Sequence, residues 1–185
     1  MAGASMKDIK LRIKSVESTM QITKAMELVA SSKLRKAKER QERCRPYFTG
    51  LKQTLESIET ATHDFSSPYQ QHREVKKRCL IVIAGDRGLA GGYNSNVFKS
   101  VLPLLREGPV CVLPIGKRTV EFFARNDVEM LTTEFAEAAS VSVADCFTIS
   151  NLVTQGYLSG QYDEVSVVYT RFVSMLTQTP AQDSL

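Results

Sequence analysis

Apolar residues recur at helical spacing along the first part of the chain. Between residues 9 and 20 they fall at steps of four, three and four, which is the spacing of a coiled-coil seam, and after a shift the steps of four and three resume. The seam residues are Ile9, Ile13, Val16, Met20, Ile22, Met26 and Val29. No Pro or Gly lies between Met6 and Arg45. The pattern therefore predicts one uninterrupted helix, roughly 55–60 Å long.

Such a helix is too long to bury its apolar stripe on one small domain. Beyond Pro46 a second apolar series, Phe48, Leu51, Leu55 and Ile58, continues the helix with a kink. We therefore predict a first domain over residues 1–60, a long basic helix that lies against another long helix or inside another protein. The alternative is a surface helix packed lengthwise on its own domain. The length favours a mechanical or assembly role over a catalytic one.

The rest of the chain alternates strand and helix patterns. Continuous apolar runs at 79–84, 110–115 and 164–173 are typical of strands buried on both faces, and 128–131 is a possible short strand. Helical spacing occurs at 94–106, 117–126 and 141–159. We predict a linker at 61–75, a small, mostly parallel α/β sheet domain at 76–176 that folds alone, and a C-terminal tail at 177–185. The fold class is α/β with a long N-terminal coiled-coil-type helix.

A glycine-rich loop follows the first strand. Its candidate residues are Gly85, Asp86, Arg87, Gly88, Gly91, Gly92 and Asn94. Phosphate-binding loops occupy this position between strand and helix, but the loop matches neither GxxxxGK[ST] nor GxGxxG. We therefore interpret it as a structural strand-to-helix turn, with Asn94, Ser95 or Asn96 capping the following helix. A nucleotide-binding enzyme that uses Gly85–Gly92 is the competing interpretation.

Charge narrows the classes of partner. Residues 7–45 contain 12 Lys or Arg and 5 Asp or Glu, a net +7, whereas the whole chain carries +4, which leaves −3 for the remainder. A basic helix can bind nucleic acid, an anionic membrane or an acidic protein. No aromatic residue precedes Tyr47 and the apolar stripe is narrow, which favours an acidic protein partner. A basic-helix nucleic-acid-binding protein with an α/β accessory domain remains the alternative.

Composition and motifs give no sign of catalysis. The four cysteines are scattered without a CxxC pair, and no nucleophile motif, metal-ligand spacing or cofactor motif occurs. No apolar run is long enough to span a membrane, and the N-terminus lacks a hydrophobic signal core, so we expect a cytosolic setting. The residues alone favour a non-enzymatic assembly protein with no catalytic, cofactor or metal site.

Several motifs in order identify a family resemblance. Residues 20–36, MQITKAMELVASSKLRK, resemble the N-terminal helix of the γ subunit of bacterial-type F-type ATP synthases. The loop DRGLAGGYNSN at 86–96 resembles the central-domain signature of the same family. Arg45–Tyr47 and Phe172–Pro180 fit in the same order, so the resemblance covers nearly the whole chain.

The resemblance implies a rotor shaft without catalytic residues of its own. In this family the N- and C-terminal helices form an antiparallel coiled coil inside a ring of α and β subunits. Rotation of the coiled coil couples proton or sodium translocation to ATP synthesis or hydrolysis on that ring. The implied partners are the α and β subunits, the ε subunit and the c-ring, with no nucleic acid, at the cytoplasmic face of the bacterial cell membrane. Lys24, Met26, Lys33 and Arg35 match the part of the shaft that passes an acidic loop of the β subunits.

One part of the family pattern has no counterpart in the sequence. After Pro180 only residues 181–185 follow, so the family's C-terminal helix and its signature are missing. We therefore expect a seam without its usual cover in this 185-residue form.

Overall fold

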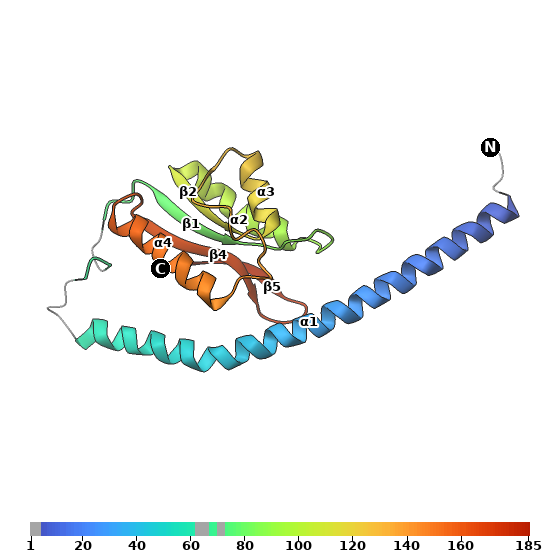
Figure 1. Cartoon of the computed structure of the whole chain (residues 1–185), viewed down its shortest axis with the longest axis horizontal. Coiled ribbons are helices and arrows are strands. Elements are labelled where there is room, and N and C mark those ends of the chain that lie inside the picture. Colours follow the sequence, from blue (N-terminus) through green and yellow to red (C-terminus); the bar gives the residue numbers. More distant parts are fainter. Residues whose placement is uncertain (1–4, 62–66, 70–72) are drawn as a thin grey trace. The chain divides into compact units, whose positions relative to one another are not determined.

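The computed structural model describes residues 5–61, 67–69 and 73–185, with the side chain of Glu59 left out. The chain divides into two compact units, residues 1–66 and 67–185. Most of the linker predicted at 61–75 therefore lies outside the described residues. Figure 1 shows the helix of the first unit in blue to teal and the sheet of the second unit in green to red.

The first unit is one helix, α1 (Met6–Ala61), of 56 residues, about 84 Å long. It begins after Ser5, whose hydroxyl oxygen accepts a hydrogen bond from Lys7 N–H and whose own N–H donates to the Asp8 carboxylate. The helix continues through Pro46 and bends in its cyan part in Figure 1. A proline inside a helix removes one backbone hydrogen bond and crowds the preceding turn, so a bend there has a direct cause.

The second unit is a five-stranded sheet with the strand order β3-β2-β1-β4-β5. Its strands are β1 (Arg78–Ile83), β2 (Val110–Ile115), β3 (Glu129–Met130), β4 (Glu164–Phe172) and β5 (Gln178–Ser184). All neighbouring pairs are parallel except β4 and β5. Its helices are α2 (Tyr93–Glu107), α3 (Lys117–Arg125) and α4 (Val143–Leu158). The predicted combination of a long N-terminal helix and a mostly parallel α/β sheet is confirmed.

The core has two layers, one on each face of the sheet. Leu80 and Val82 of β1 pack with Val97 of α2 and Phe123 of α3 on one face. Alternate β1 residues pack on the other face with Ile149 and Val153 of α4. Figure 1 shows α2 and α3 on one side of the sheet and α4 on the other. A central strand buried on both faces explains why the β1 run is continuously apolar.

Pro114 fits into β2 because the neighbouring strand has already ended. The carbonyl of Val112 accepts a hydrogen bond from Leu131 N–H on the β3 side, and a residue two positions later faces the same side. β3 pairs only with Cys111 and Val112, so the missing N–H of Pro114 costs no ladder bond. Pro114 therefore lies near the end of an internal strand without weakening the sheet.

The C-terminal part differs from the prediction. Residues 178–184, predicted within a tail, form β5 and pair in register with β4 from Phe172↔Gln178 to Ser166↔Ser184. The sequence QTPAQDS contains one small apolar residue, so its pattern gives no strand signal. The strand forms because β4 offers it a row of backbone partners.

Candidate partner-binding surfaces

The apolar stripe of α1 is exposed along its whole length. The exposed fractions of the seam side chains lie between 44% for Ile9 and 63% for Met20. Every described side chain of α1 is exposed except Leu34, which is half-buried. Burying a large apolar side chain is worth roughly 1.5–3 kcal/mol, so covering seven of them would contribute on the order of 10 kcal/mol. This stripe is therefore the strongest partner-binding feature of the first unit.

Helix geometry divides the predicted seam into two stripes. A helix turns by about 100° per residue, so the step of two from Met20 to Ile22 moves the stripe by about 200°. Residues 9, 13, 16 and 20 form stripe A, and residues 22, 26 and 29 form stripe B on nearly the opposite side. One partner helix lying along one side cannot cover both stripes. α1 therefore needs cover from two directions.

The four predicted contact residues separate in the same way. Lys24 follows Met20 by four residues and extends stripe A, and Arg35 lies eleven residues further on, about 20° round the helix. Met26 belongs to stripe B, and Lys33 extends it. Lys24 and Lys33 thus point in nearly opposite directions. The sequence identified the residues as one contact region, but the continuous helix distributes them over two sides.

The charges on these residues are largely unpaired within the helix. Among the described residues, neither Lys24 nor Lys33 has a carboxylate within 4.0 Å, whereas Arg35 Nε lies 3.9 Å from a Glu39 oxygen. Both side chains of that pair are mostly exposed, so the pair contributes little to stability. The positive charge of α1 remains available to an acidic surface.

The glycine-rich loop is held by its own polar groups. One Asp86 carboxylate oxygen accepts hydrogen bonds from the backbone N–H groups of Lys117 (3.3 Å) and Ala138 (2.8 Å), and the other accepts one from Ala139 (3.2 Å). This carboxylate ties the loop to the start of α3 and to the segment before α4. These hydrogen bonds give Asp86 a structural role in holding the loop.

Asn94 plays a different part from the one predicted. Its side-chain oxygen accepts a hydrogen bond from Gly85 N–H (2.8 Å), and its amide donates to the Arg87 carbonyl (3.1 Å). The cap residue of α2 is Gly92, and no side chain caps that helix. The prediction that Asn94, Ser95 or Asn96 caps α2 was wrong, because the Asn94 side chain closes the loop instead.

Two further glycines of the loop have local reasons to lack a side chain. Gly91 has a φ of +55°, in the left-handed region that favours glycine. A side chain at Gly88 would come 3.3 Å from the Arg118 guanidinium. Next to them Leu89 adopts a φ of +59° and leaves its side chain fully exposed. A large apolar residue held in that way at a loop tip is a candidate contact residue.

The turn between β4 and β5 adds a surface that the sequence did not indicate. Val173, Met175 and Leu176 are exposed there, Leu176 almost completely. The turn is ordered by the Ser174 hydroxyl oxygen, which accepts hydrogen bonds from the N–H groups of Leu176 and Thr177. A hollow of about 220 Å³ lies between this turn and the glycine-rich loop. The sequence placed Val173 at the end of a predicted strand and included 172–180 in the family resemblance, but it gave no prediction of a turn there.

The α4 face of the sheet is less completely covered than the other face. A largely apolar cavity of about 680 Å³ lies between α4 and the strands, with Ile81, Val165 and Ile149 among its lining residues. On the outer side of α4, Val143 and Phe147 are also exposed. A helix with apolar side chains on two opposite sides is typical of one that packs against protein on both of them.

In the described residues, no helix combines the length and the apolar character that crossing a membrane requires. The same residues contain no cluster of three or more His, Cys, Asp or Glu side chains with metal-binding geometry.

Comparison with known proteins identifies the family. The family model described as ATP synthase matches residues 5–185. The ATP synthase gamma chain of Ruminococcus albus is 46% identical over 182 residues, which is 96% of this chain and 63% of that protein. The gamma chain of Alkaliphilus metalliredigens is 45% identical and is covered to 62%. A gamma chain described as sodium ion specific, from Acetobacterium woodii, is 41% identical over 94% of this chain and 58% of its own length.

Solved structures have the same fold. The central stalk and c-ring structure of the Tetrahymena thermophila mitochondrial ATP synthase contains a chain that matches 89% of this one, at 24% identity and a TM-score of 0.67. That match covers 71% of the Tetrahymena chain. A rotor chain of the Euglena gracilis enzyme matches 95% of this chain and 60% of its own length, at 13% identity and a TM-score of 0.53.

The match with the gamma chains is broad but partial. The chain spans only 62–65% of the length of the gamma chains of Ruminococcus albus, Alkaliphilus metalliredigens and Glaesserella parasuis. The long helix, the mostly parallel sheet and the loop between β1 and α2 all lie within the matched region. The chain belongs to the ATP synthase gamma chain family.

Proposed function

We propose that this chain serves in the central rotor stalk of an F-type ATP synthase. In that role it has no catalytic residues of its own, and its rotation couples proton or sodium translocation to ATP synthesis or hydrolysis on a ring of α and β subunits. The observation that carries this proposal is α1: 56 residues of helix with an exposed apolar stripe on each of two sides and a strong positive charge. Gamma-chain relatives at 41–46% identity support it.

The two stripes of α1 suit two different kinds of partner. Stripe A has three successive steps of four, three and four, one more than stripe B, which supports a coiled coil with a second long helix over residues 9–20. Stripe B, with Lys33 at its end, lies on the other side and suits a surrounding protein surface. Partners consistent with this arrangement are the α and β subunits around the helix, and the ε subunit and c-ring at the sheet domain. The position in the cell would then be peripheral, at the cytoplasmic face of the bacterial membrane.

The positive side chains suit an acidic surface on the β subunits. Opposite charge across an interface mainly steers the approach and orientation of the partners and contributes less to holding them together. Lys24 and Arg35 lie beyond residues 9–20, where the second helix is proposed, so their side chains remain available to such a surface. We therefore expect Lys24 and Arg35 to affect coupling more than assembly. Lys33 points the other way and is expected to act on a separate contact.

Charge reversal in the assembled complex tests the proposal. The full natural chain is reconstituted into the whole ATP synthase, with its α and β subunits and its membrane sector in vesicles, and Lys24→Glu/Arg35→Glu is compared with Lys36→Glu/Arg43→Glu. The second pair makes the same change in charge on the next part of α1, about 15 Å further along the axis and about 80–100° away round the helix from Arg35. We expect the first pair to lower ATP-driven ion pumping several-fold with normal assembly, and the second pair to have a smaller effect.

The outcomes separate contact from bulk charge. Equal losses in both double variants would mean that total charge matters and the proposed side of the helix does not. A Lys24→Glu/Arg35→Glu complex that hydrolyses ATP and pumps ions like the parent at low salt would overturn the charged contact. A chain that does not assemble with α and β subunits at all would overturn the rotor proposal. In the part of the chain that the structure describes, no feature specifically favours the nucleic-acid-binding alternative.

A further inference from the structure

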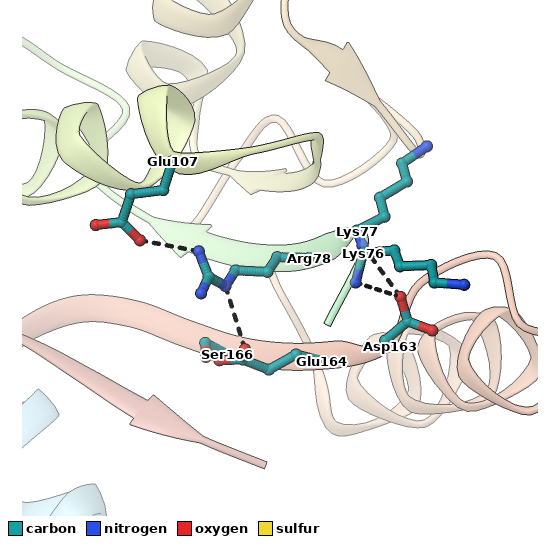
Figure 2. Close-up of polar contacts among 7 residues, drawn as sticks. All are labelled: Lys76, Lys77, Arg78, Glu107, Asp163, Glu164 and Ser166. Carbon is teal, nitrogen blue, oxygen red and sulfur yellow. Dashed lines mark hydrogen bonds and ion pairs between the residues drawn. The ribbon is translucent and has the colours of Figure 1, made fainter. Parts of the chain in front are cut away.

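A group of polar contacts surrounds the point where the connecting segment passes into the sheet. Lys76 and Lys77 immediately precede β1, and Figure 2 shows the Asp163 carboxylate facing both of them. One Asp163 oxygen accepts hydrogen bonds from the N–H groups of Lys76 (2.9 Å) and Lys77 (3.1 Å). The Lys77 carbonyl in turn accepts one from Asp163 N–H (2.9 Å). The backbone is thus fixed to the residue before β4 by three hydrogen bonds.

The next side chains connect the same point to three further elements. Lys77 Nζ lies 2.7 Å from Glu129 on β3. The Arg78 guanidinium lies 2.9 Å from Glu107 at the end of α2 and 3.2 Å from Glu164 at the start of β4, as Figure 2 shows. Lys77, Arg78 and Glu164 are each only 29% exposed in their side chains. These ion pairs extend the attachment across the sheet.

A third attachment lies upstream. The Arg73 guanidinium donates a hydrogen bond to the Tyr157 carbonyl at the end of α4 (3.0 Å) and lies 4.4 Å from the centre of the Tyr157 ring. Four basic residues within six positions are therefore involved in fixing the start of the second unit. Their partners come from α2, α4, β3 and the region where β4 begins.

Equilibrium stability alone gives little reason for so many polar contacts around one short segment. Partly exposed ion pairs contribute only about 0–1 kcal/mol each. Their position matters more when force acts along the chain. A strand pulled from its end loses its ladder bonds one after another, so resistance depends on the contacts at its first residues. β1 is the central strand, paired with β2 and β4, and its loss would divide the sheet.

We propose that Asp163, Lys77 and Arg78 form a mechanical clamp that keeps β1 from peeling when load reaches it through the segment that follows α1. The source of such load in the cell rests on the proposed rotor function. The resistance itself is a property of the second unit and is measured without the ATP synthase complex. Failure of the clamp and failure of the rotor proposal are therefore distinguishable.

Single-molecule unfolding under constant force tests the clamp on the full chain. In the first geometry, handles are attached at Cys44 on α1 and at the C-terminus, with Cys146→Ser preventing a second attachment. In the second geometry, the α1 handle is replaced by one at Glu121 on α3, in a Cys44→Ser background, so force bypasses the start of β1. Asp163→Ala is compared with Asp183→Ala, which removes a more exposed carboxylate that binds Arg171 and Tyr169.

We expect Asp163→Ala to raise the unfolding rate about tenfold in the first geometry, as loss of a hydrogen bond to a charged group implies, and to have a much smaller effect in the second. Asp183→Ala should show no such difference between geometries. An equal acceleration of Asp163→Ala in both geometries would reduce the cluster to ordinary stability, and no acceleration in either would overturn the clamp. If Asp163→Ala does not fold, Lys77→Met provides the same comparison, because it removes only the ion pair with Glu129.

Discussion

At the scale of single residues, Tyr162 and Gly156 are a matched pair. Tyr162 is the largest fully buried side chain among the described residues, and its hydroxyl donates to the Val153 carbonyl (2.9 Å). Burial raises the pKa of this phenol, so the hydroxyl stays protonated and able to donate. Gly156 lies on α4 directly against it, and a methyl group there would overlap the Tyr162 hydroxyl. The glycine makes room for the tyrosine.

We therefore predict that Gly156→Ala destabilises the second unit by about 1–3 kcal/mol, because overpacking outweighs the gain in helix propensity. Gly50→Ala is the control, since Gly50 also lies inside a helix but has open space around it. That change should stabilise α1 by about 0.5–1 kcal/mol. Hydrogen exchange at increasing urea concentration, read separately at β1 and at α1, measures the change in stability of each unit. A neutral Gly156→Ala would mean that Tyr162 can move aside.

Asp163 also predicts a dependence of stability on pH. Hydrogen bonds from the backbone N–H groups of Lys76 and Lys77 hold the pKa of its carboxyl below the usual value. A carboxyl with a lowered folded-state pKa stabilises the fold above its unfolded pKa, about 3.9, and loses that contribution as pH falls through the folded value. Asp163→Asn should therefore lower stability at neutral pH and lose that difference at strongly acidic pH. Urea unfolding of parent and variant from neutral to acidic pH measures this. A difference in unfolding free energy that stays constant over that range would contradict the prediction.

At the scale of elements, β5 changes what counts as the folding unit. The sequence suggested that residues 76–176 fold alone, but the sheet includes β5 at 178–184. A chain that ends at Leu176 loses the strand that covers the β4 edge. We expect such a chain to lose on the order of 1–3 kcal/mol in the second unit, and to aggregate more readily because β4 becomes an open edge.

A variant of unchanged length separates the strand from the mere loss of residues. Ala181 pairs with Tyr169, and its N–H faces β4, because Leu185 N–H four residues later donates to the Val165 carbonyl. Ala181→Pro therefore removes a ladder hydrogen bond and interrupts β5 without shortening the chain. It should reproduce the destabilisation of the shorter chain in urea unfolding. If both variants match the parent in stability, β5 does not support the sheet.

At the scale of the whole molecule, the glycine-rich loop determines whether the chain has chemistry of its own. Its Asp86 and Asn94 side chains are engaged by backbone groups of neighbouring elements, and the loop lacks the lysine of a phosphate-binding loop. We predict no submillimolar ATP binding by the isolated chain, measured by titration calorimetry. Binding that is lost in a Gly88→Asp variant, but kept in Gly50→Asp on α1, would instead establish a nucleotide site at the loop.

The features that depend on neighbouring residues were predictable from the sequence. A breaker-free stretch with apolar steps of three and four predicts a long helix, because helical hydrogen bonds join residues four apart. Continuous apolar runs predicted β1, β2 and β4, because only strands buried on both faces need them. The candidate residues on α1 and in the loop were named from such local patterns, and their roles in contacting partners remain predictions.

The remaining features depend on residues far apart in the chain, and only the tertiary structure decided them. β5 has a polar sequence and exists because β4 presents an edge. The partners of Asp86 and Asp163 lie 31–53 and 86–87 positions away along the chain. The division of the α1 stripe into two sides, by contrast, already follows from the predicted uninterrupted helix and its turn of about 100° per residue. Hydrogen bonds between distant segments leave no periodic trace in the sequence, because each partner needs only a polar group, and many positions could supply one.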